Sequence, residues 1–245
     1  MRFYNKQTAL DYERRLSAEG YPGMLLEAVL EDLDGGGSVI DVGAGTGFFS
    51  IPLAERGYLV HAVEPSGEML ALLKKKIRSA FARRVIIHQC LWEDWSGGRA
   101  DRLVCVHSLY PMKDPAAAIA KMAHSADRSV LVLRADEGIR ALTALLRAAF
   151  GGRRGSTVSI KDVRSILTGL GIDAAVRAVV EERTVAIPDL TAEVEYYRRH
   201  LNLGADSRDG IRKVIEENTE TLDGERVFRG VLRDWLVVFP GAGKA

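Results

Sequence analysis

The stretch from residue 39 to residue 57, VIDVGAGTGFFSIPLAERG, constrains the fold of this chain more than any other. Its first four residues form a short apolar run around one acid, which suits a strand buried on both faces. Gly43 to Gly47 form a turn that only small residues allow. Residues 48–56 carry apolar side chains at helical spacing, and Gly57 ends that helix. A strand, a glycine turn and a helix in this order predict a ligand at the carboxyl end of a buried sheet.

The spacing of the glycines narrows the kind of ligand. A dinucleotide-binding turn needs glycine at its first, third and sixth positions. Here Phe48 occupies the sixth position, and the third glycine is Gly47 at the fifth. The turn therefore reads G-x-G-x-G, with Asp41 two positions before the first glycine. This spacing disfavours a nicotinamide-dependent oxidoreductase.

The pattern D-V-G-A-G-T-G resembles the first motif of the class I S-adenosylmethionine-dependent methyltransferases. The resemblance implies that the turn wraps around the amino-acid end of that cofactor. It also implies that Asp41 helps to hold the ammonium group, directly or through water. The cofactor-binding residues expected in the turn are Gly43, Ala44, Gly45 and Gly47. The alternative is a glycine turn that only packs a helix on a sheet.

A second strand is predicted over residues 58–63, and Glu64 follows it. An acid about twenty positions after the glycine turn typically binds a ribose diol, because one carboxylate accepts from two adjacent hydroxyls. The phrase V-E-P-S-G-E-M-L resembles the second motif of the same family, which implies that Pro65 and Met69 flank the adenine. The alternative for Glu64 is a helix cap or a surface charge.

The third predicted strand, residues 85–88, leads into a loop that caps the adenine in the family. Leu91 stands where the family most often has an acid, and the nearest acids are Glu93 and Asp94. We expect contacts from the backbone of Leu91 and Trp92, with Trp92 near the base and Glu93 beside it. A purely structural Trp92 is the alternative, since large aromatic side chains usually lie in the core.

The fourth predicted strand, residues 103–106, is followed by His107 and Tyr110, next to where the methyl group is delivered in the family. The Asn-Pro-Pro-aromatic signature of many amino and base methyltransferases is absent, and so is a metal-binding acid cluster. His107 and Tyr110 are the candidate catalytic residues, and His107 also the candidate for a cofactor contact. A base is needed only if the attacking atom carries a proton. The alternative is a histidine without a catalytic role.

The N-terminal segment is predicted to be helical over residues 8–18 and 24–33, with three glycines before the first strand. In many related methyltransferases such a segment lies over the cofactor pocket and contributes a tyrosine. Tyr12 is the candidate here and Tyr4 the weaker one. Tyr12 alternatively packs its helix on the sheet.

A fifth strand over residues 129–133 completes the alternation of strands and helices, which predicts a doubly wound, Rossmann-like α/β fold in three layers. Strands over 172–187 and 226–239 complete seven, with the last antiparallel as in the methyltransferase fold. We predict a single domain over residues 1–245. It comprises a helical cap over 1–37, a cofactor-binding core over 38–135 and a helical insert over 189–225 near the substrate side.

Composition limits the remaining possibilities. The net charge of the 245-residue chain is +1, which argues against a mainly electrostatic nucleic-acid binder. Cys90 and Cys105 form no disulfide framework and lack the spacing of a zinc site. No stretch resembles a signal peptide or reaches membrane-spanning length. We therefore expect a soluble, cytoplasmic protein with no membrane partner and an oligomeric state left open.

The predicted function is transfer of a methyl group from S-adenosylmethionine to a small molecule by direct in-line displacement, without a metal. Methylation of RNA or protein is a second possibility. A third is a protein that binds the cofactor without turnover, because the family signature is missing after the fourth strand.

Overall fold

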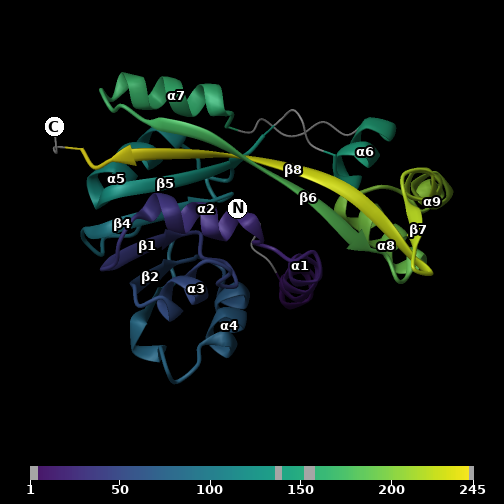
Figure 1. Cartoon of the computed structure of the whole chain (residues 1–245), viewed down its shortest axis with the longest axis horizontal. Coiled ribbons are helices and arrows are strands. Elements are labelled where there is room, and N and C mark those ends of the chain that lie inside the picture. Colours follow the sequence, from purple (N-terminus) through teal and green to yellow (C-terminus); the bar gives the residue numbers. More distant parts are fainter. Residues whose placement is uncertain (1–4, 136–139, 152–157, 243–245) are drawn as a thin grey trace. The chain divides into compact units, whose positions relative to one another are not determined.

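The computed structural model describes residues 5–135, 140–151 and 158–242 of the 245-residue chain (Figure 1). The helices are α1 (Lys6–Ala18), α2 (Met24–Leu33), α3 (Ser50–Glu55), α4 (Gly67–Lys76), α5 (Pro115–Ser125), α6 (Leu142–Ala149), α7 (Ile160–Gly169), α8 (Leu190–His200) and α9 (Arg208–Glu217). The strands are β1 (Ser38–Val42), β2 (Leu59–Val63), β3 (Val85–His88), β4 (Ala100–Val106), β5 (Ala126–Arg134), β6 (Ala175–Ala186), β7 (Glu220–Leu222) and β8 (Glu225–Pro240). Short 3-10 helices cover Ala82–Arg84 and Ala205–Ser207.

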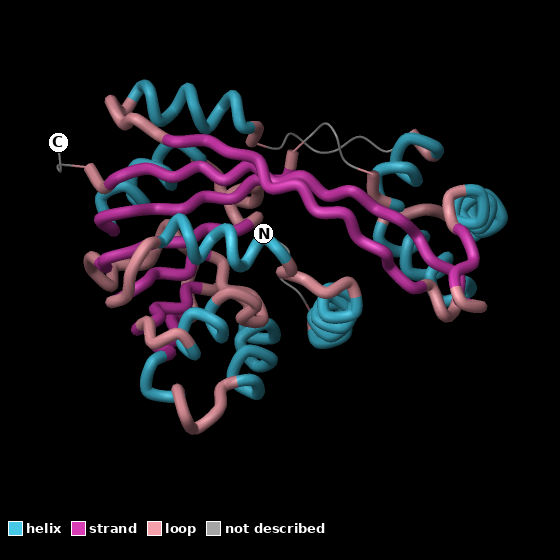
Figure 2. Tube along the Cα trace, in the orientation of Figure 1, coloured by secondary structure: helices cyan, strands magenta, loops and turns pink. Residues whose placement is uncertain are grey.

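The strands of the described residues form one sheet in the order β3-β2-β1-β4-β5-β8-β6 (Figure 2). The first five strands of this order are parallel to one another, and β8 runs antiparallel to β5. This confirms the predicted doubly wound fold with an antiparallel last strand. The sheet has an eighth strand, β7, which pairs with β8 and was not predicted. Its three residues are all exposed, so no apolar pattern marks it in the sequence.

Alternation along the buried strands builds a core on each face of the sheet. Val39 packs in one cluster, whereas Ile40 and Val42 pack in another. Since successive side chains of a strand point to opposite faces, the two clusters lie on opposite sides of the sheet. The first cluster includes side chains of α2, α3 and α4, and the second includes side chains of α5 and α7. The predicted three-layer arrangement is therefore present.

Local sequence signals explain where the helices beside the site begin. The Ser66 hydroxyl accepts a hydrogen bond from the Met69 amide at the start of α4. The Asp114 carboxylate accepts from the Ala117 amide at the start of α5, and Pro115 is the first helical residue. Both are N-cap arrangements, and proline at the first position already has a helical φ.

The three glycines before β1 form a braced turn. The Tyr58 hydroxyl donates to the carbonyl of Gly35, and Arg102 donates to the carbonyls of Leu33 and Asp34. Gly37 has a φ of +99°, and a Cβ there would lie 2.4 Å from a carboxylate oxygen of Asp101. Glycine is therefore required at Gly37 by both conformation and space.

The chain divides into two compact units. The first comprises residues 1–134, 158–179 and 234–245, and the second residues 135–157 and 180–233. The second unit has its own cluster of buried side chains, contributed by α6, α8, α9 and β8. The predicted helical insert, 189–225, lies within this unit, which is larger than the insert. Its place near a substrate stays a prediction.

None of the helices in the described part of the chain is long and apolar enough to cross a membrane.

Candidate active site

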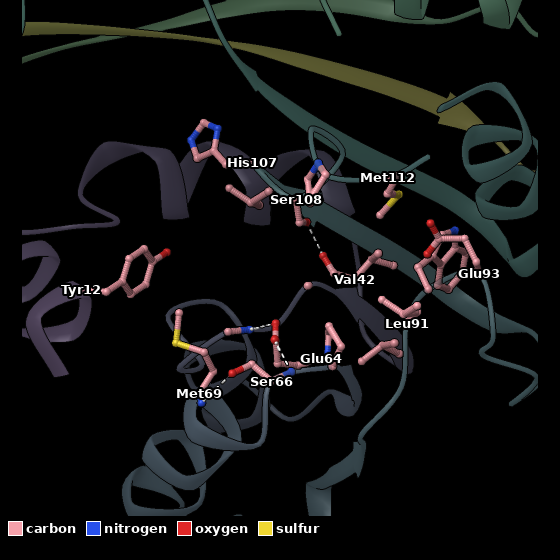
Figure 3. Close-up of a pocket in the computed structure, with 17 residues that line it drawn as sticks. Tyr12, Val42, Glu64, Ser66, Met69, Leu91, Glu93, His107, Ser108 and Met112 are labelled. Carbon is pink, nitrogen blue, oxygen red and sulfur yellow. Dashed lines mark hydrogen bonds between the residues drawn. The ribbon is translucent and has the colours of Figure 1, made fainter. Parts of the chain in front are cut away.

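A cavity of about 250 Å³ opens at the carboxyl ends of three parallel strands of the first unit (Figure 3). Val42, Val63 and Val106, the last residues of β1, β2 and β4, all line it. The edge of a doubly wound sheet where the strand order reverses is where such folds bind ligands. The other lining residues are Tyr12, Gly43, Gly45, Glu64, Pro65, Ser66, Met69, Leu91, Trp92, Glu93, His107, Ser108, Pro111 and Met112.

The glycine turn after β1 presents backbone to the cavity. Gly43 has a φ of +76°, and a Cβ there would lie 2.3 Å from the Cβ of Ser108. The Ser108 hydroxyl in turn donates to the carbonyl of Val42 at 2.5 Å. Gly45 has a φ of +55°, and a Cβ there would meet only the Gly43 carbonyl oxygen, at 3.9 Å. The turn therefore fits tightly against Ser108 on one side and leaves room for a ligand at Gly45.

The Glu64 carboxylate joins this turn to the end of β2. One of its oxygens accepts a hydrogen bond from the Gly45 amide at 3.1 Å, and the other accepts from the Ser66 amide at 2.8 Å. Burial raises the pKa of Glu64, while these two hydrogen bonds act to lower it. A carboxylate has about four acceptor positions, so each oxygen keeps one for a ligand hydroxyl.

The loop after β3 forms another part of the cavity wall, and Figure 3 shows Leu91 and Glu93 in this part. Trp92 is 3% exposed, stacks on Trp95 with ring centroids 5.3 Å apart, and donates its indole N–H to the carbonyl of Ala118. The carbonyls of Leu91 and Trp92 already accept from the amides of Asp94 and Trp95. Trp92 thus serves the core and the cavity wall together.

His107 lies at the end of β4 in a strained conformation. Its φ of +54° is unusual for a residue with a side chain, and such strain is often kept at functional sites. Its Nε2 lies 3.4 Å from a guanidinium nitrogen of Arg134 and 3.5 Å from a carboxylate oxygen of Asp234. Burial, and then the Arg134 charge, hold the pKa of His107 well below its usual value. His107 is therefore neutral at pH 7.

Comparison with known proteins agrees with this geometry. Residues 39–127 match the family model described as a methyltransferase domain. The magnesium-protoporphyrin O-methyltransferase of Synechocystis sp. is 30% identical over 148 residues, or 56% of this chain. The match spans 63% of that protein, less than two thirds of its length.

Solved structures share the fold at low identity. A putative methyltransferase from an antibiotic biosynthesis pathway of Anabaena variabilis aligns with a TM-score of 0.63 and 14% identity, over 87% of this chain and 96% of its own. The magnesium protoporphyrin IX methyltransferase of Synechocystis, solved with bound S-adenosylmethionine, aligns with a TM-score of 0.50 and 18% identity, over 96% and 85%. The family match covers the glycine turn, Glu64 and the loop after β3, which contribute to the cavity wall.

In this family match and in its fold, the chain resembles the class I S-adenosylmethionine-dependent methyltransferases.

The structure brings most of the predicted site residues together around one cavity. Those that line it are Tyr12, Gly43, Gly45, Glu64, Pro65, Met69, Leu91, Trp92, Glu93 and His107. Tyr4, the alternative to Tyr12, lies outside the described residues. Contact of the lining residues with a cofactor stays a prediction.

Asp41 does not line the cavity. Its carboxylate is 3% exposed and accepts a hydrogen bond from the Ser50 hydroxyl at 2.5 Å, on the first residue of α3. Burial raises the pKa of Asp41 to about 6, although the Ser50 hydrogen bond acts against this. This contact ties β1 to α3, and the expected hold of Asp41 on an ammonium group, directly or through water, stays a prediction.

Ala44, Gly47 and Tyr110 also lie away from the cavity wall. Ala44 is buried in the first core cluster. A Cβ at Gly47 would lie 2.3 Å from Cδ1 of Leu73, so Gly47 allows the turn to pack on α4. The Tyr110 hydroxyl accepts a hydrogen bond from the Arg134 amide at 2.6 Å, which ties its loop to the end of β5. Each of the three thus has a packing contact, and its predicted role at the site stays a prediction.

The sequence reasoning missed several lining residues, among them Ser66, Ser108 and Met112. Ser66 caps the start of α4, and this role alone explains a serine at its position in the sequence. Ser108 could have been found from its position, since a small residue after β4 is what lets the Gly43 backbone approach. No pattern in the sequence marks Met112.

The residues present fit the family's cofactor. The glycine turn leaves open space only where Gly45 lacks a side chain, and the Glu64 carboxylate stands next to that space. His107 Nδ1 is buried and has no hydrogen-bond partner among the described residues. Within the described ranges there is no group of three or more His, Cys, Asp or Glu side chains that could hold a metal ion.

Proposed function

We propose that this protein transfers a methyl group from S-adenosylmethionine to a small-molecule acceptor by direct in-line displacement. The observation that supports it best is the 3.1 Å hydrogen bond between the Gly45 amide and Glu64. This hydrogen bond joins the turn proposed to bind the amino-acid end of the cofactor to the carboxylate proposed to bind its ribose, at one cavity.

The chain divides cofactor binding among three segments. When bound, S-adenosylmethionine supplies an electrophilic methyl group on a sulfonium. The leaving group, S-adenosylhomocysteine, is a neutral thioether and needs no proton. The backbone of Gly43 and Gly45 binds the amino-acid end, and the free acceptor positions of Glu64 bind the ribose hydroxyls. Pro65, Met69, Leu91 and Trp92 surround the base.

His107 is the candidate residue on the acceptor side. A neutral imidazole accepts a proton only at the nitrogen that carries no hydrogen. His107 therefore serves as the base, for an attacking hydroxyl or amine, in the tautomer whose Nε2 carries the hydrogen beside Asp234 and whose Nδ1 accepts. The buried Nδ1 must then become accessible when ligands bind, because it is covered here. Holding donor and acceptor in line supplies up to about 7–11 kcal/mol in the best intramolecular models.

A small-molecule acceptor is supported by two observations. The net charge of +1 offers little attraction for a nucleic-acid backbone. The curated relative is by its name an O-methyltransferase of magnesium-protoporphyrin, a small molecule.

Two measurements test the proposal. Calorimetry with S-adenosylmethionine, S-adenosylhomocysteine and NAD should show binding of the first two and not of NAD. Transfer of labelled methyl groups is then measured against metabolite extract, bulk RNA and protein. Label in small molecules supports the proposal, and label confined to RNA or protein overturns the acceptor class. Binding without transfer to any of them would favour a cofactor-binding protein without turnover.

A further inference from the structure

Lys121 lies in the middle of α5, outside the cavity, and holds the loop that forms one end of the cavity. Its ammonium group donates to the carbonyl of Trp92 at 2.7 Å and to that of Glu93 at 2.9 Å. It also lies 4.9 Å from the centroid of the Trp92 ring. The Lys121 ammonium group therefore holds two consecutive carbonyls and the Trp92 ring, which lie between α5 and the cavity.

The same helix fixes the loop at a second point. Trp92 donates its indole N–H to the Ala118 carbonyl, one turn before Lys121 on α5. Hydrogen bonds to a charged donor are stronger than neutral ones, and a cation over tryptophan adds to them. The backbone of residues 92 and 93 is thus held from outside the cavity, while the same residues line it.

These contacts also use the backbone acceptors of the loop. The carbonyl of Leu91 accepts from the Asp94 amide, that of Trp92 from Trp95 and Lys121, and that of Glu93 from Lys121. Both acceptor positions of the Trp92 carbonyl are thus filled, and the other two carbonyls keep one each. An adenine amine is a donor and needs an acceptor. Among the loop residues that line the cavity, Glu93 carries the one charged acceptor, its carboxylate, and a charged acceptor binds an amine more strongly than a carbonyl does.

We infer that Lys121 is a positioning residue for the cofactor: it fixes the loop so that the Glu93 carboxylate accepts from the exocyclic amine of the adenine. This rests on the proposed function, because it assumes that the cavity holds the nucleoside of S-adenosylmethionine. Glu93 then takes the role of the acid that Leu91 replaces, two positions later in the loop. Lys121 never touches the cofactor and acts through the two carbonyls.

The first test removes the ammonium group. Lys121→Met keeps most of the apolar stem and deletes the donors, so affinity for S-adenosylhomocysteine should fall at least tenfold in calorimetry. Lys113→Met is the matched control, because Lys113 is exposed, lies before α5 and is not on the cavity wall. Its affinity should stay within twofold of the wild type. Thermal unfolding shows whether each variant is folded.

The second test reads the adenine contact itself. S-inosylhomocysteine replaces the exocyclic amine by a carbonyl, which a carboxylate repels and an amide N–H can bind. The wild type should prefer S-adenosylhomocysteine, and Glu93→Gln should reduce this preference at least tenfold. Asp94→Asn is the control, since this neighbouring acid does not line the cavity. Lys121→Met should also reduce the preference, which a loss of stability alone would not do.

The outcomes separate the inference from the function on which it rests. A wild type that binds neither S-adenosylmethionine nor S-adenosylhomocysteine would refute the proposed function. A wild type that binds them, with Lys121→Met unchanged in affinity and in preference, would overturn the inference alone. If Lys121→Met does not fold, an unchanged preference in Glu93→Gln still overturns it.

Discussion

At the scale of single residues, Glu64 and Asp41 show how two acids near one turn take different roles. Both are buried, and burial raises the pKa of each. Glu64 accepts from two backbone amides and borders the cavity, whereas Asp41 accepts from Ser50 beneath the turn. Substitution of the two should therefore affect different properties.

Glu64→Gln should weaken binding of S-adenosylmethionine tenfold or more, about 1.4 kcal/mol. An amide has only one oxygen, so it cannot accept from both backbone amides and both ribose hydroxyls. Calorimetry measures the affinity, and Glu68→Gln, on the exposed side of α4, is the control. Equal affinities for wild type and Glu64→Gln would remove the assigned role.

Asp41→Asn should change how stability depends on pH. The pKa of Asp41 is about 6 in the folded protein and about 3.9 in an unfolded chain. The folded state thus binds more protons between these values, and stability falls as pH rises from about 4 to 6. Asn does not titrate, so the variant should gain stability relative to the wild type over this range. Urea midpoints at pH 4.5 and 7 measure it, and a constant difference would contradict the assignment.

At the scale of elements, adjacent strands place two histidines against each other. His61 on β2 and His88 on β3 stack at 5.3 Å, with Nδ1 of His61 3.1 Å from Nε2 of His88. Burial lowers the pKa of both, and the charge of His88 lowers that of His61 further. Protonation of both imidazoles at once is therefore unfavourable in the folded protein.

This pair should weaken the fold in acid. A folded pKa below the unfolded value of about 6.5 means that the unfolded chain binds more protons, so stability rises with pH through this range and falls as pH drops below about 6.5. His88→Gln should reduce that loss, measured as the change in urea midpoint between pH 7.5 and 5. A loss as large as in the wild type would show that the pair does not titrate together.

At the scale of the molecule, the described residues that line the cavity all belong to the first unit. The second unit has its own core, in which Ile215 of α9 is fully buried. Ile215→Ala should therefore destabilise the protein by about 2–5 kcal/mol while S-adenosylmethionine affinity stays within twofold. Chemical denaturation and calorimetry on the same sample check both statements. A large loss of affinity in a folded variant would contradict this prediction, because it would show that the second unit contributes to cofactor binding.

Much of the first unit could be predicted from the sequence because its signals are local. The glycine turn and Glu64 come directly after strands in the sequence, so both must lie at the carboxyl edge of the parallel sheet. The direction of the Asp41 side chain depends on Ser50, nine residues later, and no motif encodes that contact. The second unit is built from two segments separated by residues 158–179 of the first unit, and its core joins α6 to α9 across about sixty residues of chain. The hold of Lys121 on the loop is similarly non-local.

The side chains of β1 alternate between the two core clusters, so the gene cannot gain or lose a codon within this strand without disturbing both clusters. Adding or removing one codon within Ser38–Val42 would exchange the faces of Val39 and Ile40 and displace the glycine turn from Ser108. The loop around residues 96–98, which is exposed and lies between elements, has no such constraint. Length variation among natural homologues should therefore be found there and be absent from β1.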